Sequence, residues 1–284
     1  MNPSKYSNHI SAFLLILMVS TFIFAFYPAW KNLILAWSSS DEYSHGFLMV
    51  PVALYIVWRK KAKLVSMKIQ PSNWGLAFII FSLSCYLFAY FAEISTLSSL
   101  SIVLVIIGTL LYLLGYPILK ELFFPIFLLL FMIPIPAQIY SSLTVPLQLF
   151  VSKVSVAIAA LLGVPIYREG NVLHLPDRTL QVVHACSGLR SMISLLTLSA
   201  VFGYLTLRSD ALRTVLFISG IPVSILVNIF RVLLLVIAFY YFRFDLTTGT
   251  VHTVFGMLIF VLALISLFAI KGALSLWDKS ATPE

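Results

Sequence analysis

The most constraining feature of this 284-residue sequence is a series of long apolar runs that recurs from end to end. About 20 consecutive apolar residues are enough for a helix to cross the hydrocarbon core of a bilayer. Hydrophobic residues make up 61% of the chain and charged residues only 10%, which excludes a soluble domain of this length. The sequence therefore predicts an all-α polytopic membrane protein with about eight transmembrane helices, at roughly residues 10–30, 44–58, 74–92, 97–116, 122–139, 188–207, 214–241 and 253–270.

One further apolar segment, residues 141–162, carries polar side chains on a single helical face. Gln148, Ser152 and Ser155 are spaced four and three residues apart, which places them on one side of a helix. Such a face favours an interfacial or re-entrant helix over a span that faces lipid.

The positions of the basic residues lead to the same topology. With the N-terminus in the cytoplasm and residues 141–162 not crossing, most of the 18 Lys and Arg residues face the cytoplasm, as the positive-inside rule requires. This set comprises Lys5, Arg59, Lys60, Lys61, Lys63, Lys68, Lys120, Arg208, Arg213, Lys271 and Lys279. Because these residues are scattered between apolar runs and form no basic face, we expect no nucleic-acid partner.

The longest connection, residues 163–185, differs from the rest of the chain. Apolar and polar residues alternate around Pro176 and Asp177, which predicts a short extracytoplasmic β-hairpin. We find no internal repeat, low-complexity tract or linker, so residues 1–284 are interpreted as a single integral membrane domain.

Three residues that suit catalysis are predicted at one depth near the outer face. Cys186 begins the sixth span, where a helix N-terminus lowers the pKa of a thiol. Arg231 lies roughly 26 Å along the seventh span from Thr214 at 1.5 Å per residue, and His252 begins the eighth. A thiol, a guanidinium and an imidazole are the parts of a cysteine acyl-transfer site. The other cysteine, Cys85, is better explained as a small buried apolar residue.

Three short blocks resemble the signature segments of the exosortase/archaeosortase family. They are Ala-Cys-Ser-Gly-Leu-Arg-Ser at 185–191, Asn-Ile-Phe-Arg at 228–231 and His-Thr-Val-Phe-Gly at 252–256. Tyr-Ser-His-Gly-Phe-Leu at 43–48 and the stretch 145–171 also match, so the resemblance covers nearly the whole chain.

The resemblance implies a membrane-embedded cysteine peptidase and transpeptidase that cleaves C-terminal sorting signals of exported proteins. In bacteria such a signal typically holds a Pro-Glu-Pro motif, a transmembrane helix and a basic tail. Cys186 would be the nucleophile, Arg231 the catalytic arginine and His252 the general base. The protein would lie in the bacterial inner membrane with its site toward the extracytoplasmic side. Its partners would be membrane-anchored substrate proteins, membrane lipid and an acceptor nucleophile that the sequence does not identify.

Five other residues are weaker candidates for substrate binding. His184 stands where many relatives have an acidic residue, and it is a rival base if a strand continues through Cys186. Arg190, one helical turn after the cysteine, binds a substrate carboxylate or extends to the interface. Asn228 orients the catalytic arginine or makes an interhelical hydrogen bond. Tyr43 and His45 form a wall of the site or an ordinary interfacial belt.

The sequence leaves two alternatives open. A non-catalytic transporter or assembly component for exported protein or polysaccharide would also carry charged groups in its spans, but near the midplane and in repeated halves. Hydrolysis and transfer proceed through the same acyl-enzyme and are not separable by sequence. No metal-ligand spacing and no Gly-rich phosphate loop occur, so we expect no metal and no cofactor.

Overall fold

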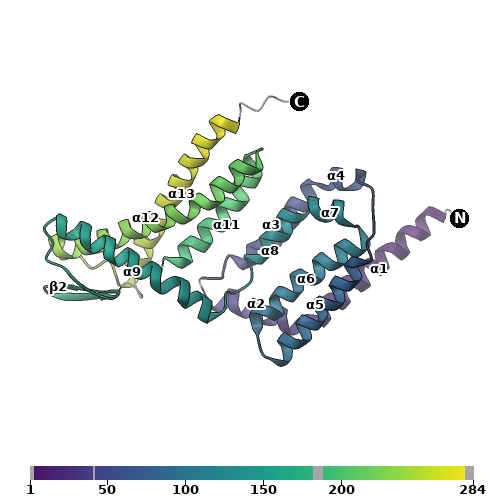
Figure 1. The fold of residues 1–284 in the computed structure, drawn as a ribbon, viewed down its shortest axis with the longest axis horizontal. Coiled ribbons are helices and arrows are strands. Elements are labelled where there is room, and N and C mark those ends of the chain that lie inside the picture. Colours follow the sequence, from purple (N-terminus) through teal and green to yellow (C-terminus); the bar gives the residue numbers. More distant parts are fainter. Residues whose placement is uncertain (1–2, 41, 182–187, 279–284) are drawn as a thin grey trace. The chain divides into compact units, whose positions relative to one another are not determined.

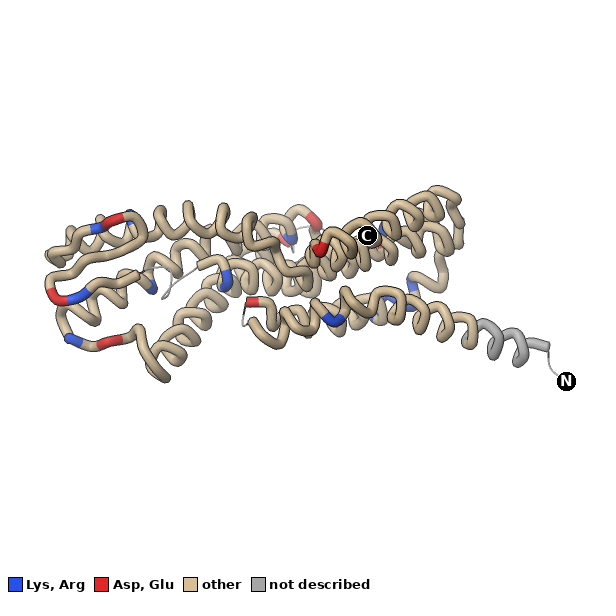
Figure 2. The backbone as a smooth tube through the Cα atoms, turned by 90° about the horizontal axis from the view of Figure 1, so that it is seen from below, with Lys and Arg blue, Asp and Glu red and all other residues tan. Residues whose placement is uncertain are grey.

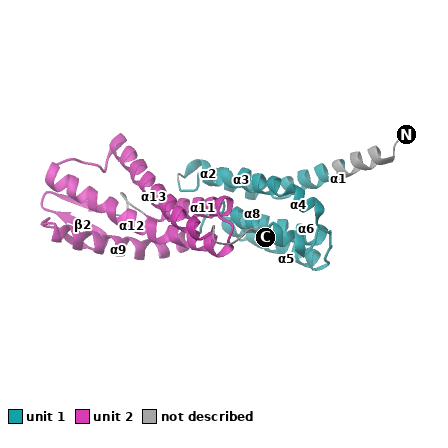
Figure 3. Ribbon diagram, turned by 90° about the horizontal axis from the view of Figure 1, so that it is seen from above, with its two compact units in different colours: residues 1–135 teal, residues 136–284 magenta. Residues whose placement is uncertain are grey.

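The computed structural model describes residues 3–40, 42–181 and 188–278, and the chain divides into two compact units, residues 1–135 and 136–284 (Figure 1, Figure 3). Unit 1 contains α1 (Pro3–Ala25), α2 (Tyr27–Ser39), α3 (Gly46–Arg59), α4 (Lys61–Ser66), α5 (Trp74–Phe91), α6 (Ser95–Leu113), α7 (Tyr116–Glu121) and α8 (Phe123–Leu130). Unit 2 contains α9 (Ala137–Leu161), β1 (Tyr167–Glu169), β2 (Val172–Leu175), β3 (Arg178–Gln181), α11 (Leu189–Thr206), α12 (Asp210–Phe242) and α13 (Gly249–Asp278).

Unit 1 is organised around the closely packed helices α5 and α6. A Cβ atom added at Gly75 would lie 2.2 Å from the backbone nitrogen of Tyr112, and one at Gly108 would lie 2.9 Å from Ile79. Glycine at these positions lets the two backbones approach, as is common between membrane helices. An apolar core beside this pair gathers side chains of α2, α3, α6 and α7.

Unit 2 packs three long helices, α11, α12 and α13, against one another (Figure 1). A second apolar cluster joins α9 and the sheet to α12, and in it Val151 of α9, Leu173 of β2 and Val236 of α12 are all buried. The sheet therefore lies against the C-terminal end of α12.

Within the described residues, six helices are long and apolar enough to cross a membrane: α5, α6, α9, α11, α12 and α13. A seventh span results if Phe13–Ala25 and Tyr27–Ser39, which are bent by 69°, are counted together. The protein is thus multi-pass and mostly helical, as the composition predicts, but the count of eight spans is not confirmed.

Two predicted spans are shorter or interrupted in the structure. Residues 44–58 correspond to α3, which has 14 residues. The continuous span predicted at 122–139 was wrong, because α8 ends at Leu130 and α9 begins at Ala137. Pro134 and Pro136 explain the break, since proline lacks the backbone N–H and disfavours helical geometry at the preceding residue.

Helix α9 buries the polar face that the sequence assigns to a membrane interface. Gln148, Ser152 and Ser155 are almost completely buried. Ser152 donates a hydrogen bond to the Gly170 carbonyl, and Ser155 donates one to the Ile229 carbonyl on α12. This face therefore packs on protein, and its polarity does not indicate an interfacial position. The interfacial or re-entrant helix is not confirmed, and α9, with 25 residues, is one of the helices long enough to cross.

The predicted hairpin is confirmed as part of a three-stranded antiparallel sheet in the order β1-β2-β3. Strands β2 and β3 pair around Pro176 and Asp177, from Leu175 opposite Arg178 to Val172 opposite Gln181. Strand β1 was not predicted, because its three residues include two charged ones and show no apolar alternation.

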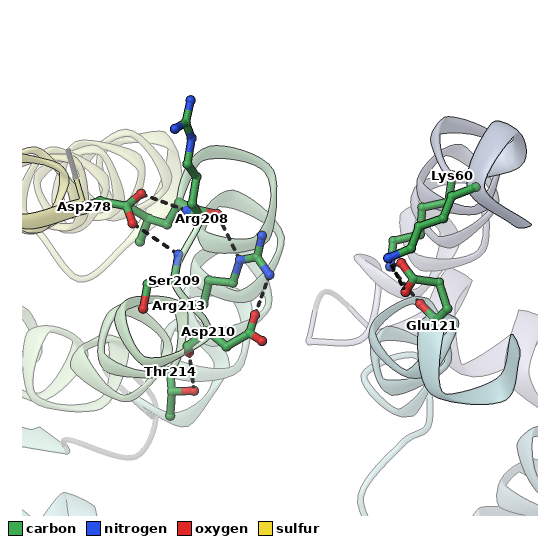
Figure 4. A network of polar contacts seen from close by, with 10 residues as sticks. Lys60, Glu121, Arg208, Ser209, Asp210, Arg213, Thr214 and Asp278 are labelled. Carbon is green, nitrogen blue, oxygen red and sulfur yellow. Dashed lines mark hydrogen bonds and ion pairs between the residues drawn. The ribbon is translucent and has the colours of Figure 1, made fainter. Parts of the chain in front are cut away.

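Charged residues lie mainly at helix ends and in connections (Figure 2). In unit 2, Asp278 accepts hydrogen bonds from the backbone N–H groups of Arg208 at 2.8 Å and Ser209 at 3.1 Å (Figure 4). In unit 1, Glu121 forms ion pairs with Lys60 and Lys63, each at 2.7 Å. These contacts fasten helix ends within each unit.

Candidate active site

Arg231 and His252, which come from different blocks of the sequence, meet in unit 2. Arg231 lies on α12, eleven residues before the helix ends at Phe242, and His252 lies in the first turn of α13. The Arg231 Nη2 and His252 Nε2 atoms are 3.4 Å apart. The structure therefore brings the guanidinium and the imidazole together beside the start of α13.

The contacts of His252 define which ring nitrogen carries the proton. Its Nδ1 atom lies 3.1 Å from the carbonyl oxygen of Leu246, and a carbonyl oxygen can only accept a hydrogen bond. Its Nε2 atom faces Arg231, whose guanidinium can only donate. Both contacts are satisfied by one neutral tautomer, with the proton on Nδ1 and the lone pair on Nε2. In this state Nε2 carries no proton, and its lone pair accepts the hydrogen bond from Arg231.

Arg231 has hydrogen-bonding capacity that the described residues do not use. Its Nε atom is buried and has no hydrogen-bond partner in the described part of the chain. A Cβ atom added at Gly256, one turn after His252, would lie 3.6 Å from Arg231 Nη2, so the glycine leaves room beside the guanidinium. An unsatisfied buried donor costs about 1–3 kcal/mol. A guanidinium with such a spare donor is suited to receive an anionic oxygen atom.

Gly188 connects the cysteine block to the same part of α12. It precedes α11 with a φ of +68°, and a Cβ atom added there would lie 2.7 Å from the Asn228 amide nitrogen. Asn228 is 4% exposed and lies one helical turn before Arg231. Cys186 and His184 lie outside the described residues, but the glycine two residues after Cys186 packs against the helix that carries Arg231.

We expect Gly188→Ala to destabilise the protein more than Gly170→Ala. Both glycines have a positive φ, which costs alanine about 1–2 kcal/mol. Only at Gly188 does the added methyl group also collide with a buried side chain, since nothing lies within 4 Å of the Cβ position at Gly170. The thermal unfolding midpoints of the two purified variants in detergent measure the difference. Equal midpoints would show that the Gly188–Asn228 contact contributes nothing.

The remaining predicted site residues lie in different places. Arg190 is the second residue of α11 and is exposed. Tyr43 and His45 belong to unit 1, where the Tyr43 hydroxyl donates to the Ile135 carbonyl at 3.5 Å and His45 Nε2 lies 3.1 Å from the Phe131 carbonyl.

These two contacts of unit 1 are part of a larger set on one short segment. Trp37 donates to the Met132 carbonyl at 2.8 Å, and Thr96 donates to the Pro134 carbonyl at 3.0 Å. Four side chains thus bind carbonyl groups of residues 131–135, which follow α8. Inside a membrane such irregular backbone must find its hydrogen bonds within the protein. In the structure, Tyr43 and His45 supply two of these hydrogen bonds.

Sequence reasoning missed the Leu246 carbonyl and the ion pair of Arg178 with Asp245 next to it. A backbone acceptor leaves no signal in a residue pattern. The ion pair does leave one, because Arg178 lies in the predicted hairpin and Asp245 lies between two predicted spans. Within residues 3–40, 42–181 and 188–278, no three His, Cys, Asp or Glu residues are grouped so that they could hold a metal ion.

A model of the family described as transmembrane exosortase matches residues 37–269, a range that extends over both units. The comparison with curated proteins and the comparison with solved structures return no match.

Proposed function

This chain belongs to the transmembrane exosortase family, and from that premise we propose that it is a membrane-embedded cysteine peptidase and transpeptidase of C-terminal sorting signals. The observation that carries the proposal is the contact of Arg231 with His252. Each residue stands in a block that resembles a family signature, and Gly188 of the cysteine block packs against the same helix. Because Gly188 comes two residues after Cys186, the chain keeps the Cα atoms of these two residues within about 7 Å of each other.

The proposed reaction begins when the Cys186 thiolate attacks the carbonyl carbon of the scissile peptide bond. His252 Nε2 takes the thiol proton and later gives it to the leaving amine, which leaves a thioester between the substrate and Cys186. Arg231 donates to the oxyanion that forms during the attack. Water or an acceptor amine then attacks the thioester and restores the thiol.

The proposed substrates are membrane-anchored proteins that end in a Pro-Glu-Pro motif, a transmembrane helix and a basic tail. This class follows from the family resemblance, as do the bacterial inner membrane and the unidentified acceptor. We place the site on the extracytoplasmic side because that topology puts most Lys and Arg residues in the cytoplasm. This topology requires that α9 does not cross the membrane, so that both of its ends lie on the same side.

The geometry supports catalysis better than transport. Transporter sites typically lie at the midplane between repeated halves. Here the contact of Arg231 with His252 lies in the first turn of α13, and no repeated halves occur in the sequence. In the Nδ1–H tautomer the Nε2 atom of His252 carries a lone pair and no proton, which is the form that a general base needs.

We expect His252→Ala to lower processing of a cognate substrate by about 10²–10⁴-fold, the usual contribution of a general base. His184→Ala should retain most of the activity. The assay is co-expression with a reporter that ends in Pro-Glu-Pro, an apolar helix and a basic tail, followed by mass measurement of the released product.

His184→Ala is the matched control, since both variants remove one imidazole near the proposed nucleophile. Membrane insertion of each variant is checked by its detergent-extracted yield. If His184→Ala were inactive and His252→Ala active, the role of base would pass to His184. If neither mattered, the acid–base part of the proposal would be wrong.

A further inference from the structure

The connection between α12 and α13, residues 243–248, is fastened to the sheet by side chains. Arg178, at the start of β3, donates from Nη1 to Asp245 and from Nη2 to the Thr247 hydroxyl at 3.2 Å. The same guanidinium lies over the Phe239 ring, 5.3 Å from its centroid. A planar guanidinium that reaches two acceptors and stacks on a ring is held in one orientation.

Asp245 uses both of its carboxylate oxygens. Oδ2 accepts from Arg178, and Oδ1 accepts from the Thr247 backbone N–H at 2.8 Å and from its hydroxyl at 2.5 Å. Burial alone would raise the pKa of Asp245, but the hydrogen bonds from Thr247 and Arg178 outweigh it and hold the pKa below its ordinary value. The carboxylate therefore stays ionised, and keeps its contacts, to a lower pH than an ordinary aspartate does.

The residue between these two anchored positions is Leu246, whose carbonyl oxygen accepts the hydrogen bond from His252 Nδ1 at 3.1 Å. The side-chain contacts fix the backbone on both sides of this carbonyl. We propose that Arg178 and Asp245 are positioning residues, which hold the carbonyl and thereby fix the ring orientation and the Nδ1–H tautomer of His252. This inference rests on the proposed role of His252 as the base.

The physical reason lies in the two tautomers of a neutral imidazole. Either nitrogen can carry the proton, and the hydrogen bond made by one nitrogen selects the tautomer. When the carbonyl is displaced, the proton can move to Nε2, which then has no lone pair for the thiol proton. Loss of the Arg178–Asp245 contact should therefore reduce the fraction of molecules that are competent for acylation.

A second ion pair on the same connection provides a matched control. Arg243 pairs with Asp177 in the β2–β3 turn, and their side chains are 64% and 57% exposed, against 32% for both Arg178 and Asp245. This pair also joins the sheet to the connection, but it does not flank Leu246. Exposed pairs contribute little, typically about 0–1 kcal/mol. Arg243→Ala therefore removes the same charge without disturbing the carbonyl.

The test reads the tautomer of His252 directly, by ¹⁵N magnetic resonance of histidine-labelled protein in lipid bilayers at alkaline pH. The His252 signal is identified by its absence from His252→Ala. We expect the Nδ1–H tautomer in the wild type and in Arg243→Ala, and a mixture of tautomers in Arg178→Ala. Processing of the reporter should fall about tenfold in Arg178→Ala and recover in part in Arg178→Lys, which keeps one contact with Asp245.

Two further variants make the outcome decisive. Asp245→Asn keeps an oxygen for the Thr247 contacts and removes the charge that pairs with Arg178, so it replaces Arg178→Ala if that variant does not fold. A pure Nδ1–H tautomer in both variants would overturn the inference. If His252→Ala processes the reporter normally, the proposed base is wrong, and the tautomer pattern still decides whether the Arg178–Asp245 pair positions the ring.

Discussion

Cys186→Ala is expected to abolish processing of the reporter, by about four orders of magnitude or more, whereas Cys85→Ala should process it normally. Removing the nucleophile of a covalent mechanism removes the whole acylation route, so its effect is among the largest that a single substitution can have. Cys85 lies on α5 in unit 1 and belongs to none of the three family-like blocks. It is therefore the matched control for a change from thiol to methyl.

The intermediate gives the sharpest measurement. A thioester on Cys186 should appear in the mass spectrum as a substrate adduct that hydroxylamine removes, since acylation and deacylation are separate steps. The new C-terminus of the product then reports the acceptor. A free carboxylate would indicate hydrolysis, and an added amine or lipid would indicate transfer.

The same pair of cysteine variants tests the side of the membrane. A membrane-impermeant maleimide added to spheroplasts should label the wild type and Cys85→Ala but not Cys186→Ala. If Cys186→Ala still processed the reporter, the enzyme proposal would be refuted. If Cys186 were essential but never labelled from outside, the predicted side would be wrong while the nucleophile would stand.

The long spans of unit 2 were predictable because their signal is local. Residues 188–207, 214–241 and 253–270 are predominantly apolar, and the structure places α11, α12 and α13 there. The buried contacts of the polar stripe of α9 were not predicted, because the same stripe suits an interface or a buried contact. Its partners, Gly170 and Ile229, are distant in sequence, so only the folded structure distinguishes the two cases.

The common depth of Arg231 and His252 also followed from the sequence, because the boundaries of two consecutive spans fix which residues share one end. The 3.4 Å contact agrees with that expectation. The sequence could not predict the contact of His252 Nδ1 with the Leu246 carbonyl. This carbonyl belongs to the backbone, and Arg178, on a strand 68 residues away in sequence, holds its position through Asp245. Asn228 was a candidate, but its packing against Gly188 depends on how α11 meets α12.

Arg231→Lys is expected to reduce processing by about 10²–10³-fold, the usual loss when one oxyanion donor is removed, or about 3–4 kcal/mol of transition-state stabilisation. Lysine keeps the positive charge but replaces the planar fork with a single ammonium group. The Arg231 Nη2 atom already faces His252 Nε2, and its buried Nε has no partner among the described residues. An ammonium cannot meet the imidazole and an oxyanion with the same geometry.

The control for this change is Arg213→Lys, the same substitution on the same helix. Arg213 lies in the first turn of α12, where it donates to Asp210 and to the Leu207 carbonyl, and a lysine there should alter stability slightly and processing not at all. Initial rates of reporter processing, normalised to the amount of inserted enzyme, measure both variants. Full activity in Arg231→Lys would reduce Arg231 to a source of positive charge. An equal loss in both variants would attribute the effect to packing of α12. A loss of processing confined to Arg231→Lys would show that processing needs the two-point geometry of the guanidinium at this position, because both variants keep the positive charge and change the same helix.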